Sequence, residues 1–188
     1  LVGSEMCIRD SNLPDLRLDT LKTLYNSKQI FPATFKFVDI AGLIAGASQG
    51  EGLGNKFLQN IREVDAICHV VRCFDDKSVT HEYETVDPIR DAKIINLELA
   101  ISDYEIVTKR IEKIRKKADS GDKESIKELS VLRALEEVLK QGQSAQTAQL
   151  SADDLLLIKS LNLITLKPVL YAANISETDI VNPEDNIY

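Results

Sequence analysis

The sequence predicts an α/β fold into which an antiparallel helical hairpin is inserted. Three apolar runs, at residues 34–39, 66–74 and 167–174, have the composition of β-strands, and helical segments separate them. Between the second and third runs, apolar residues recur every three or four positions over two long stretches, 97–118 and 126–139. Strands that alternate with helices are typical of an α/β domain, and the two long stretches predict the hairpin.

The first part of the chain contributes a short helix and two of the strands. Residues 1–11 have no usable periodicity and resemble a translated sequencing adapter, so they are interpreted as a non-native leader outside the fold. Leucines at roughly helical spacing predict a helix over 16–25. The strand at 34–39 is followed by a helix over 55–64, which has one apolar side, and then by the strand at 66–74. This succession predicts a βαβ unit with a right-handed parallel crossover.

The rest of the chain holds the hairpin and the last strand. The two amphipathic helices are separated by a polar turn at Gly121, and their apolar stripes are typical of a coiled coil. After a polar linker comes a helix capped by Ser151, and the run at 167–174 predicts another buried strand. The predicted organisation is a leader at 1–11, a partial α/β domain at 12–90, a helical coiled-coil insertion at 91–148 and the remainder of the α/β domain at 149–188.

Composition limits the classes of protein to which the chain can belong. The net charge is −7, so the surface as a whole does not attract nucleic acid, and no DNA partner is expected. No apolar run approaches the roughly 20 residues of a membrane span, and no secretory signal core is found. The three cysteines lack a disulfide framework spacing, and Cys68 and Cys73 are expected to be buried. The predicted location is the cytoplasm, with no membrane partner.

The first candidate site lies directly after the strand at 34–39. Asp39 ends that strand, Gly42 follows three residues later, and five of the eight glycines fall within the thirteen residues that begin at Gly42. A carboxylate that a strand delivers to a glycine-rich turn suits a nucleotide switch, because it can hold the water shell of Mg²⁺ beside the terminal phosphate. The alternative is a tight strand-to-helix turn. The length of the glycine-rich segment favours the nucleotide site.

The residue after Gly42 bears on hydrolysis. Many GTPases have a glutamine there that orients the attacking water, and Leu43 cannot perform that step. Either the site does not hydrolyse nucleotide, or another group positions the water. His69 lies within the strand at 66–74 and is expected to be a buried core residue. His81 lies in the polar segment after that strand, where it either reaches a phosphate or is exposed to solvent.

A second candidate site follows the last strand. Asn174, Ile175, Ser176 and Glu177 come at its end, and ligands of open α/β sheets bind at the carboxyl ends of strands. Many GTPases have an aspartate, which accepts hydrogen bonds from guanine, where this chain has the longer Glu177. That difference is expected to change the choice of base. The alternative is a helix-starting turn capped by Ser176.

Basic residues gather near the predicted tip of the hairpin. They are Lys109, Arg110, Lys113, Arg115, Lys116 and Lys117. One interpretation is a solvated helix face. The other is a contact with RNA phosphates on a large partner, which the acidity of the rest of the chain makes worth testing.

Four segments closely resemble the YchF subfamily of Obg-like ribosome-binding ATPases. They are residues 37–43, 50–58, 69–74 and 167–177, of which the second, containing Gly-Glu-Gly-Leu-Gly-Asn, is highly specific. The similarity begins at about residue 14 and continues to the C-terminus. The resemblance implies a P-loop NTPase with a Ras-like G domain and an inserted coiled coil. It also implies ATP or GTP as the substrate, Mg²⁺ as the cofactor and the large ribosomal subunit as the partner.

The resemblance further implies roles for residues near the phosphates. Asp39 and Gly42 match the D-x-x-G motif, in which the aspartate holds Mg²⁺ through water and the glycine contacts the γ-phosphate. Leu43 matches the hydrophobic residue that replaces the catalytic glutamine in this class. His81 aligns with a loop histidine proposed to assist hydrolysis.

The base-recognition motif N-x-x-E matches Asn174 and Glu177, with Ile175 contributing a backbone contact. The sequence contains no G-x-x-x-x-G-K-[ST] motif, so the chain is expected to be an internal fragment, inactive alone, whose sheet lacks the strand between those at 34–39 and 66–74. The alternative function is a non-catalytic ribosome- or RNA-binding module that acts through the hairpin. Its candidate contacts are Lys113, Lys116 and Lys117.

Overall fold

The computed structural model describes residues 8–39, 53–76, 83 and 85–181. The chain divides into two compact units, residues 1–42 and residues 43–188, and each is described by itself.

The first unit contains a two-stranded antiparallel sheet and one helix. β1 (Ile8–Asn12) pairs with β2 (Thr34–Val38), whose alternation of aromatic and polar residues suits a strand. Between them, α1 (Leu16–Tyr25) begins where the side chain of Asp15 accepts a hydrogen bond from the backbone N–H of Arg17. The helix expected over 16–25 and the strand expected over 34–39 are both present, the strand ending one residue earlier.

β1 takes in residues that the sequence analysis placed in the leader. Antiparallel pairing uses backbone N–H and C=O groups, so a segment without hydrophobic periodicity can still form a strand along the edge of β2. The lack of periodicity in residues 1–11 was therefore an insufficient reason to leave residues 8–11 out of the fold.

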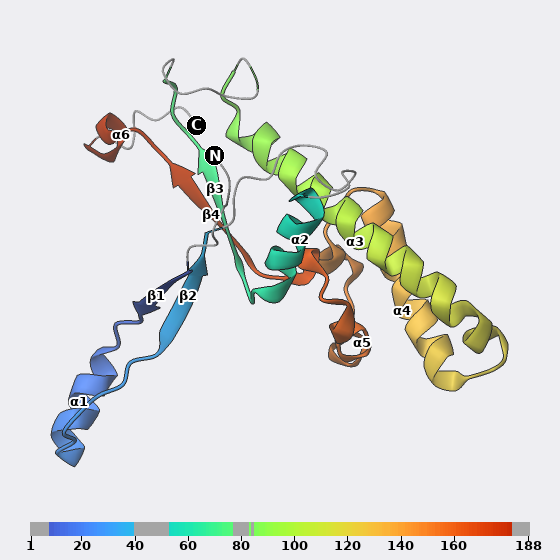
Figure 1. Ribbon diagram of the computed structural model, residues 1–188, viewed down its shortest axis with the longest axis horizontal. Coiled ribbons are helices and arrows are strands. Elements are labelled where there is room, and N and C mark those ends of the chain that lie inside the picture. The colour runs from blue at the N-terminus through green and yellow to red at the C-terminus, as the bar shows by residue number, and fades with distance from the viewer. Residues whose placement is uncertain (1–7, 40–52, 77–82, 84, 182–188) are drawn as a thin grey trace. The chain divides into compact units, whose positions relative to one another are not determined.

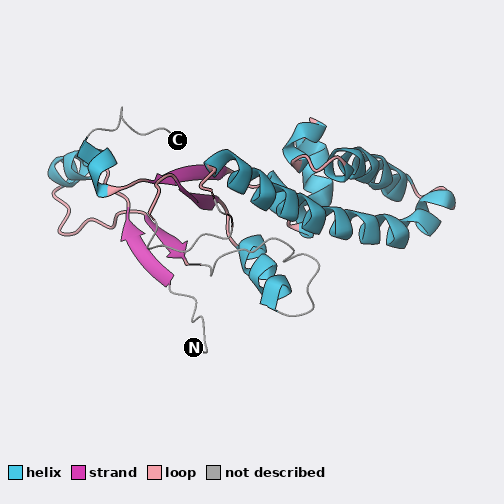
Figure 2. Cartoon of the chain, turned by 90° about the horizontal axis from the view of Figure 1, so that it is seen from above, coloured by secondary structure: helices cyan, strands magenta, loops and turns pink. Residues whose placement is uncertain are grey.

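The second unit is built around two parallel strands and a long helical hairpin (Figure 1). Its elements are, in order, α2 (Leu53–Glu63), β3 (Ile67–Arg72), α3 (Pro88–Asp119), α4 (Lys123–Lys140), η1 (Ala145–Ala148), α5 (Ala152–Ile158), η2 (Lys159–Leu161), η3 (Ile164–Leu166), β4 (Val169–Asn174) and α6 (Glu177–Val181). The hairpin α3–α4 is seen lengthwise in Figure 2. The expected order of strands and helices is therefore present, although α3 begins three residues before the insertion boundary expected at 91.

The described strands form two separate sheets. β3 and β4 are parallel neighbours, with Ile67 opposite Val169 and Arg72 opposite Asn174. β2 pairs with β1 in the first unit.

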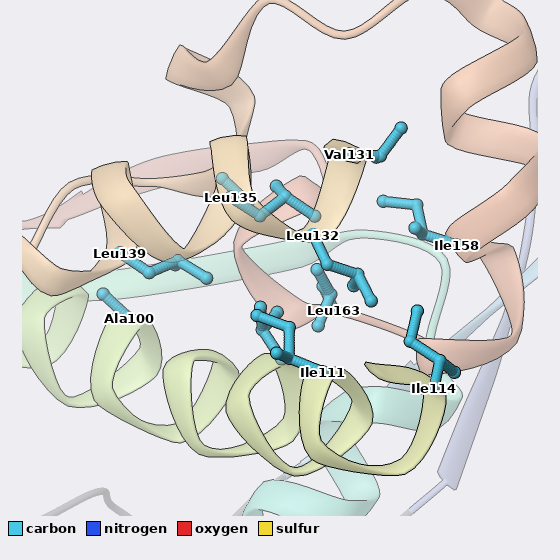
Figure 3. Close-up of a cluster of buried hydrophobic side chains, with 11 residues drawn as sticks. Ala100, Ile111, Ile114, Val131, Leu132, Leu135, Leu139, Ile158 and Leu163 are labelled. Carbon is cyan, nitrogen blue, oxygen red and sulfur yellow. The ribbon is translucent and has the colours of Figure 1, made fainter. Parts of the chain in front are cut away.

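The apolar stripes of the hairpin form the main core of the second unit (Figure 3). Ile111 and Ile114 of α3 face Leu132 and Leu135 of α4, and Ile158 of α5 closes the cluster. Leu132 and Leu135 are fully buried. Burial of such a side chain contributes about 1.5–3 kcal/mol, so this cluster accounts for much of the stability of the hairpin.

The ends of the hairpin helices are set by caps. Asp87 caps α3 through the backbone N–H of Arg90, and Asp122 caps α4 through that of Ser125. The two glycines at the ends of α4 differ in their surroundings. Gly121, in the turn before α4, has a φ of 91° and open space around it, whereas Gly142, with a φ of 73°, lies against Leu97, where an added Cβ would meet the leucine methyl at 2.8 Å.

The burial expected for the two parallel strands is wrong. Val70 of β3 is 64% exposed and Leu170 of β4 is 68% exposed. Cys68, expected to be buried, is exposed, while Cys73 is buried as predicted. The physical reason is that two strands alone leave sheet surface uncovered, although their apolar composition suits a strand with layers on both faces.

Candidate functional site

Asp39 follows the last residue of β2 and is exposed. Its carboxylate is therefore accessible from solvent at the end of a strand, which is the position expected for it. Gly42 and Leu43, together with most of the glycine-rich segment, lie outside the described residues. Of the residues predicted to lie beside the phosphates, Asp39 is therefore the one that the described part of the chain contains.

Asn174 is the last residue of β4 and lies at the carboxyl end of the parallel pair. Its backbone carbonyl accepts a hydrogen bond from the N–H of Cys73 at 2.8 Å, which fixes the backbone at the ends of both strands. Asn174 is exposed, and Ile175 is half-buried behind it. The structure therefore presents this amide where open α/β sheets bind their ligands.

Ser176 and Asp179 begin α6. The backbone N–H of Ser176 donates to Asp179 Oδ2, and the backbone N–H of Asp179 donates to Ser176 Oγ, each at 3.3 Å. This reciprocal pattern is a capping box. Glu177 is exposed beside the cap. The helix-starting turn and the base-recognition motif are therefore compatible, because the cap uses Ser176 and leaves Asn174 and Glu177 accessible.

Two arginines, Arg72 before residues 77–82 and Arg90 after them, each contact an aromatic ring and a backbone carbonyl. The guanidinium of Arg72 lies 4.6 Å from the centroid of the Phe74 ring and donates from Nε to the Phe74 carbonyl at 3.0 Å. The guanidinium of Arg90 lies 4.4 Å from the centroid of the Tyr83 ring and donates to the Thr85 carbonyl at 2.7 Å. His81 lies between these flanks, outside the described residues.

His69 is half-buried on β3, and its ring lies beside that of Tyr171 on β4, with centroids 5.4 Å apart. Burial lowers the pKa of His69 below its ordinary value of 6.5. The ring packs against Tyr171 in the sheet, but His69 is half-buried rather than the fully buried core residue that was expected.

The basic tip of the hairpin is exposed. Lys113, Lys116 and Lys117 lie on the last turns of α3, and none of them forms an ion pair with another described residue. Arg110 differs, because its guanidinium binds Glu128 of α4, with Nε and Oε1 2.6 Å apart. The three lysines, here called the tip lysines, are thus available to a partner, whereas Arg110 holds the two helices together.

The structure also contains a buried polar cluster that the sequence analysis missed. Asp103 of α3 is fully buried and forms an ion pair with Arg62 of α2, with Nη1 and Oδ1 2.8 Å apart. The signal was present, because Asp103 falls on the apolar stripe of α3, three residues after Ala100 and four before Val107. A charged residue at a core position indicates a buried partner.

Two classes of site can be assessed over the described residues. No group of three or more His, Cys, Asp or Glu residues there could hold a metal ion. Among the helices in that part of the chain, none combines the length and the apolarity needed to cross a bilayer.

Comparison with known proteins gives consistent matches. A family model described as 50S ribosome-binding GTPase matches residues 9–101. The ribosome-binding ATPase YchF of Mycoplasma genitalium is 54% identical over 176 residues, covering 93% of this chain and 47% of that protein. The Bacillus subtilis protein of the same name is 46% identical over 185 residues, covering 96% of this chain and 50% of that protein.

A solved structure is also similar. The YchF GTPase of Schizosaccharomyces pombe superposes with a TM-score of 0.75 at 38% identity, covering 97% of this chain and 49% of that one. The chain spans about half the length of the curated relatives it matches. Sequence and backbone together show that the chain belongs to the YchF family.

Proposed function

We propose that the protein to which this chain belongs is a nucleoside triphosphatase that hydrolyses ATP or GTP and binds the ribosome. The observation that carries the proposal is the exposed Asn174 at the carboxyl end of β4, followed by Glu177, in a chain of the YchF family. Side chains at that edge of a parallel sheet are suited to bind a nucleotide base. The names of the relatives, which include ribosome-binding ATPase and GTPase, support both activities.

The phosphate side of the site is assigned to the segment after β2. Asp39 would hold Mg²⁺ through water, and Gly42 would contact the γ-phosphate. The donor chemistry fits, because Mg²⁺ prefers carboxylate and water oxygens and Asp39 is an accessible carboxylate. When bound, the ion neutralises charge on the phosphates. Leu43 cannot orient water, and on the resemblance to the YchF family we assign that role to His81.

The base side is assigned to Asn174, Ile175 and Glu177. An amide side chain can donate to and accept from a base, and a carboxylate accepts from an exocyclic amino group. Glu177 is one methylene longer than the aspartate that many GTPases use, which supports the use of adenine as well as guanine nucleotides. Ile175 would contribute a backbone contact.

The hairpin is the proposed ribosome-binding element, acting on the large subunit as a coiled coil. Its own buried core supports this role, because a hairpin with an independent core can project its tip from the rest of the domain. The tip lysines would contact RNA phosphates. The location proposed for such a protein is the cytoplasm.

The same hairpin core favours a second candidate function. The chain would then be a ribosome- or RNA-binding module that acts through the hairpin without turning over nucleotide. Steady-state phosphate release from the full-length protein separates the two functions. The enzyme shows ribosome-independent turnover that falls on substitution of His81 by alanine, and a turnover rate unaltered by that change removes His81 from the mechanism.

The 188-residue chain alone is expected to bind nucleotide negligibly, because its sequence holds no lysine-bearing phosphate loop. Equilibrium dialysis with a labelled ATP analogue and Mg²⁺ tests this. We expect no binding below millimolar concentration, whereas micromolar affinity would refute the expectation.

A further inference from the structure

The carboxylate of Asp103 is completely buried and fully engaged. Oδ1 accepts from Arg62 Nη1 at 2.8 Å and from the backbone N–H of Ile164 at 3.0 Å. Oδ2 accepts from the backbone N–H of Thr165 at 2.7 Å and from its hydroxyl at 2.8 Å. A buried carboxylate is tolerated only with such partners, so Asp103 is fixed in one position relative to α2 and to η3.

The C-terminal end of α2 forms further hydrogen bonds through Arg62 and the residues after it. Arg62 also donates from Nη2 to Ser102 Oγ at 2.6 Å and from Nη1 to the Asn162 carbonyl at 3.1 Å. The ammonium group of Lys167 donates to the backbone carbonyls of Arg62 and Val64. Hydrogen bonds therefore join α2 both to α3 and to the segment that leads into β4.

That segment is also fastened to the base of the hairpin. Ser144 Oγ donates to the Thr165 carbonyl at 2.7 Å, and the backbone N–H of Ala145 donates to Thr165 Oγ1 at 3.0 Å. Farther along, Asn96 of α3 donates to the Tyr171 hydroxyl at 2.8 Å. The segment that leads into β4 and the end of α2 thus share Asp103 as a hydrogen-bond partner.

We propose that Asp103 is a positioning residue that couples α2, the helix directly after the glycine-rich segment, to β4, the strand that ends at Asn174. The proposal rests on the proposed function, in which the glycine-rich segment senses the terminal phosphate and Asn174 contacts the base. Because each oxygen of one carboxylate bonds to η3 and Oδ1 also bonds to Arg62, a displacement of α2 must be shared by the start of β4 or must break these bonds. Phosphate sensing and base binding are then energetically linked.

A purely structural ion pair would behave differently. Its loss would lower the free energy of unfolding and would leave each element free to respond to nucleotide as before. A positioning residue transmits a response, so its loss weakens the link between the two elements, although the bonds from Lys167 to the end of α2 remain. The distinguishing measurement is therefore the nucleotide-dependent protection of α2 and β4, measured separately.

The test uses the full-length protein and hydrogen–deuterium exchange, with and without a non-hydrolysable ATP analogue and Mg²⁺. In the wild type, nucleotide is expected to slow exchange in residues 58–64 and in residues 164–174. In Asp103→Asn, whose amide cannot accept all four hydrogen bonds, protection of one segment is expected to fall at least threefold relative to the other. The dissociation constant for the analogue is expected to rise about tenfold.

The matched control is Glu128→Gln. It removes another arginine–carboxylate pair with two hydrogen bonds, between α3 and α4, away from α2 and β4. Protection of both segments and nucleotide affinity are expected to stay at the wild-type level. A control that behaves like Asp103→Asn would overturn the proposal, because the loss of any arginine–carboxylate pair of α3 would then suffice.

The remaining outcomes also decide the matter. A folded Asp103→Asn protein with wild-type affinity and parallel protection of both segments overturns the positioning role and leaves the proposed function intact. If Asp103→Asn does not fold, Thr165→Val removes one donor to the carboxylate together with the acceptor of the Ala145 N–H, and unchanged coupling in that variant has the same meaning. A wild-type protein that binds no ATP or GTP defeats the proposed function itself.

Discussion

Ser176 and Asp179 cap α6 reciprocally, each donating its backbone N–H to the side chain of the other at 3.3 Å. The cap and the exposed Asn174 lie within six residues of each other and yet use different groups. Substitutions can therefore separate helix initiation from the proposed binding of the base.

The first prediction concerns this separation. In the full-length protein, Ser176→Ala is expected to cost about 1 kcal/mol of stability through loss of the cap, with little change in nucleotide affinity. Asn174→Ala is expected to leave the unfolding transition unchanged and to weaken nucleotide binding about tenfold or more. Chemical denaturation and fluorescent nucleotide titration measure the two effects. Equal loss of affinity in both variants would show that the turn acts through its conformation rather than through the amide.

The second prediction concerns the length of the acidic side chain at position 177. Glu177→Asp is expected to shift preference toward GTP, because the shorter carboxylate matches the one that many GTPases use against guanine. A change of about tenfold in the ratio of the two dissociation constants corresponds to roughly 1.4 kcal/mol. Competition between labelled ATP and unlabelled GTP measures it. Glu177→Gln serves as the control of equal length, and it is expected to weaken binding of both nucleotides.

The third prediction concerns the tip lysines. Their combined reversal to glutamate is expected to reduce co-sedimentation of the full-length protein with ribosomes. If each lysine contacts one phosphate, the slope of log affinity against log salt is expected to fall by about 2–3. The control reverses three other exposed lysines, Lys93, Lys140 and Lys159, and so changes the net charge equally. If both triple variants pellet like the wild type, the tip is a solvated face.

The fourth prediction concerns the cap of α4. Hydrogen bonds from the side chain and backbone of Ser125 hold the pKa of the Asp122 carboxyl below its ordinary value of 3.8. Because the folded-state pKa is the lower one, this carboxylate stabilises the hairpin at pH values above 3.8, and the contribution is lost as the pH falls through the lowered pKa.

Asp122→Asn keeps a side chain that can cap the helix but cannot titrate. The difference in unfolding free energy between wild type and variant is expected to be constant from pH 7 to about 5 and to shrink at lower pH. Urea denaturation monitored by circular dichroism at a series of pH values measures this difference. A difference that does not change with pH would mean that the charge of the Asp122 carboxylate does not contribute to the stability of the hairpin.

The sequence predicted those parts of the fold that depend on local pattern. The hairpin could be predicted because one stripe of apolar residues on each helix makes its core. The exposure of β3 and β4 could not be predicted. An apolar residue such as Leu170 indicates a surface that is covered in a complete sheet, whereas its actual exposure depends on which strands are present. β1 was not predicted, because its pairing depends on backbone groups and the pattern of side chains carries no information about them.

One part of the candidate site could likewise be predicted from the sequence, and another part could not. The N-x-x-E motif could be found because it follows a recognisable strand, and the structure places Asn174 at the strand end as expected. The partners of Asp103 could not be found, because Arg62 is 41 residues away and Ile164 is 61 residues away along the chain. A single carboxylate in an apolar stripe indicates that a buried partner exists but does not identify that partner.

The unequal surroundings of Gly121 and Gly142 bear on which substitutions each position can accept. Open space around Gly121 means that no neighbouring atom obstructs a larger side chain there, so its φ of 91° alone favours glycine. At Gly142 the contact with Leu97 adds a steric obstacle to the positive φ. The base of the hairpin is therefore expected to tolerate substitution less well than its tip.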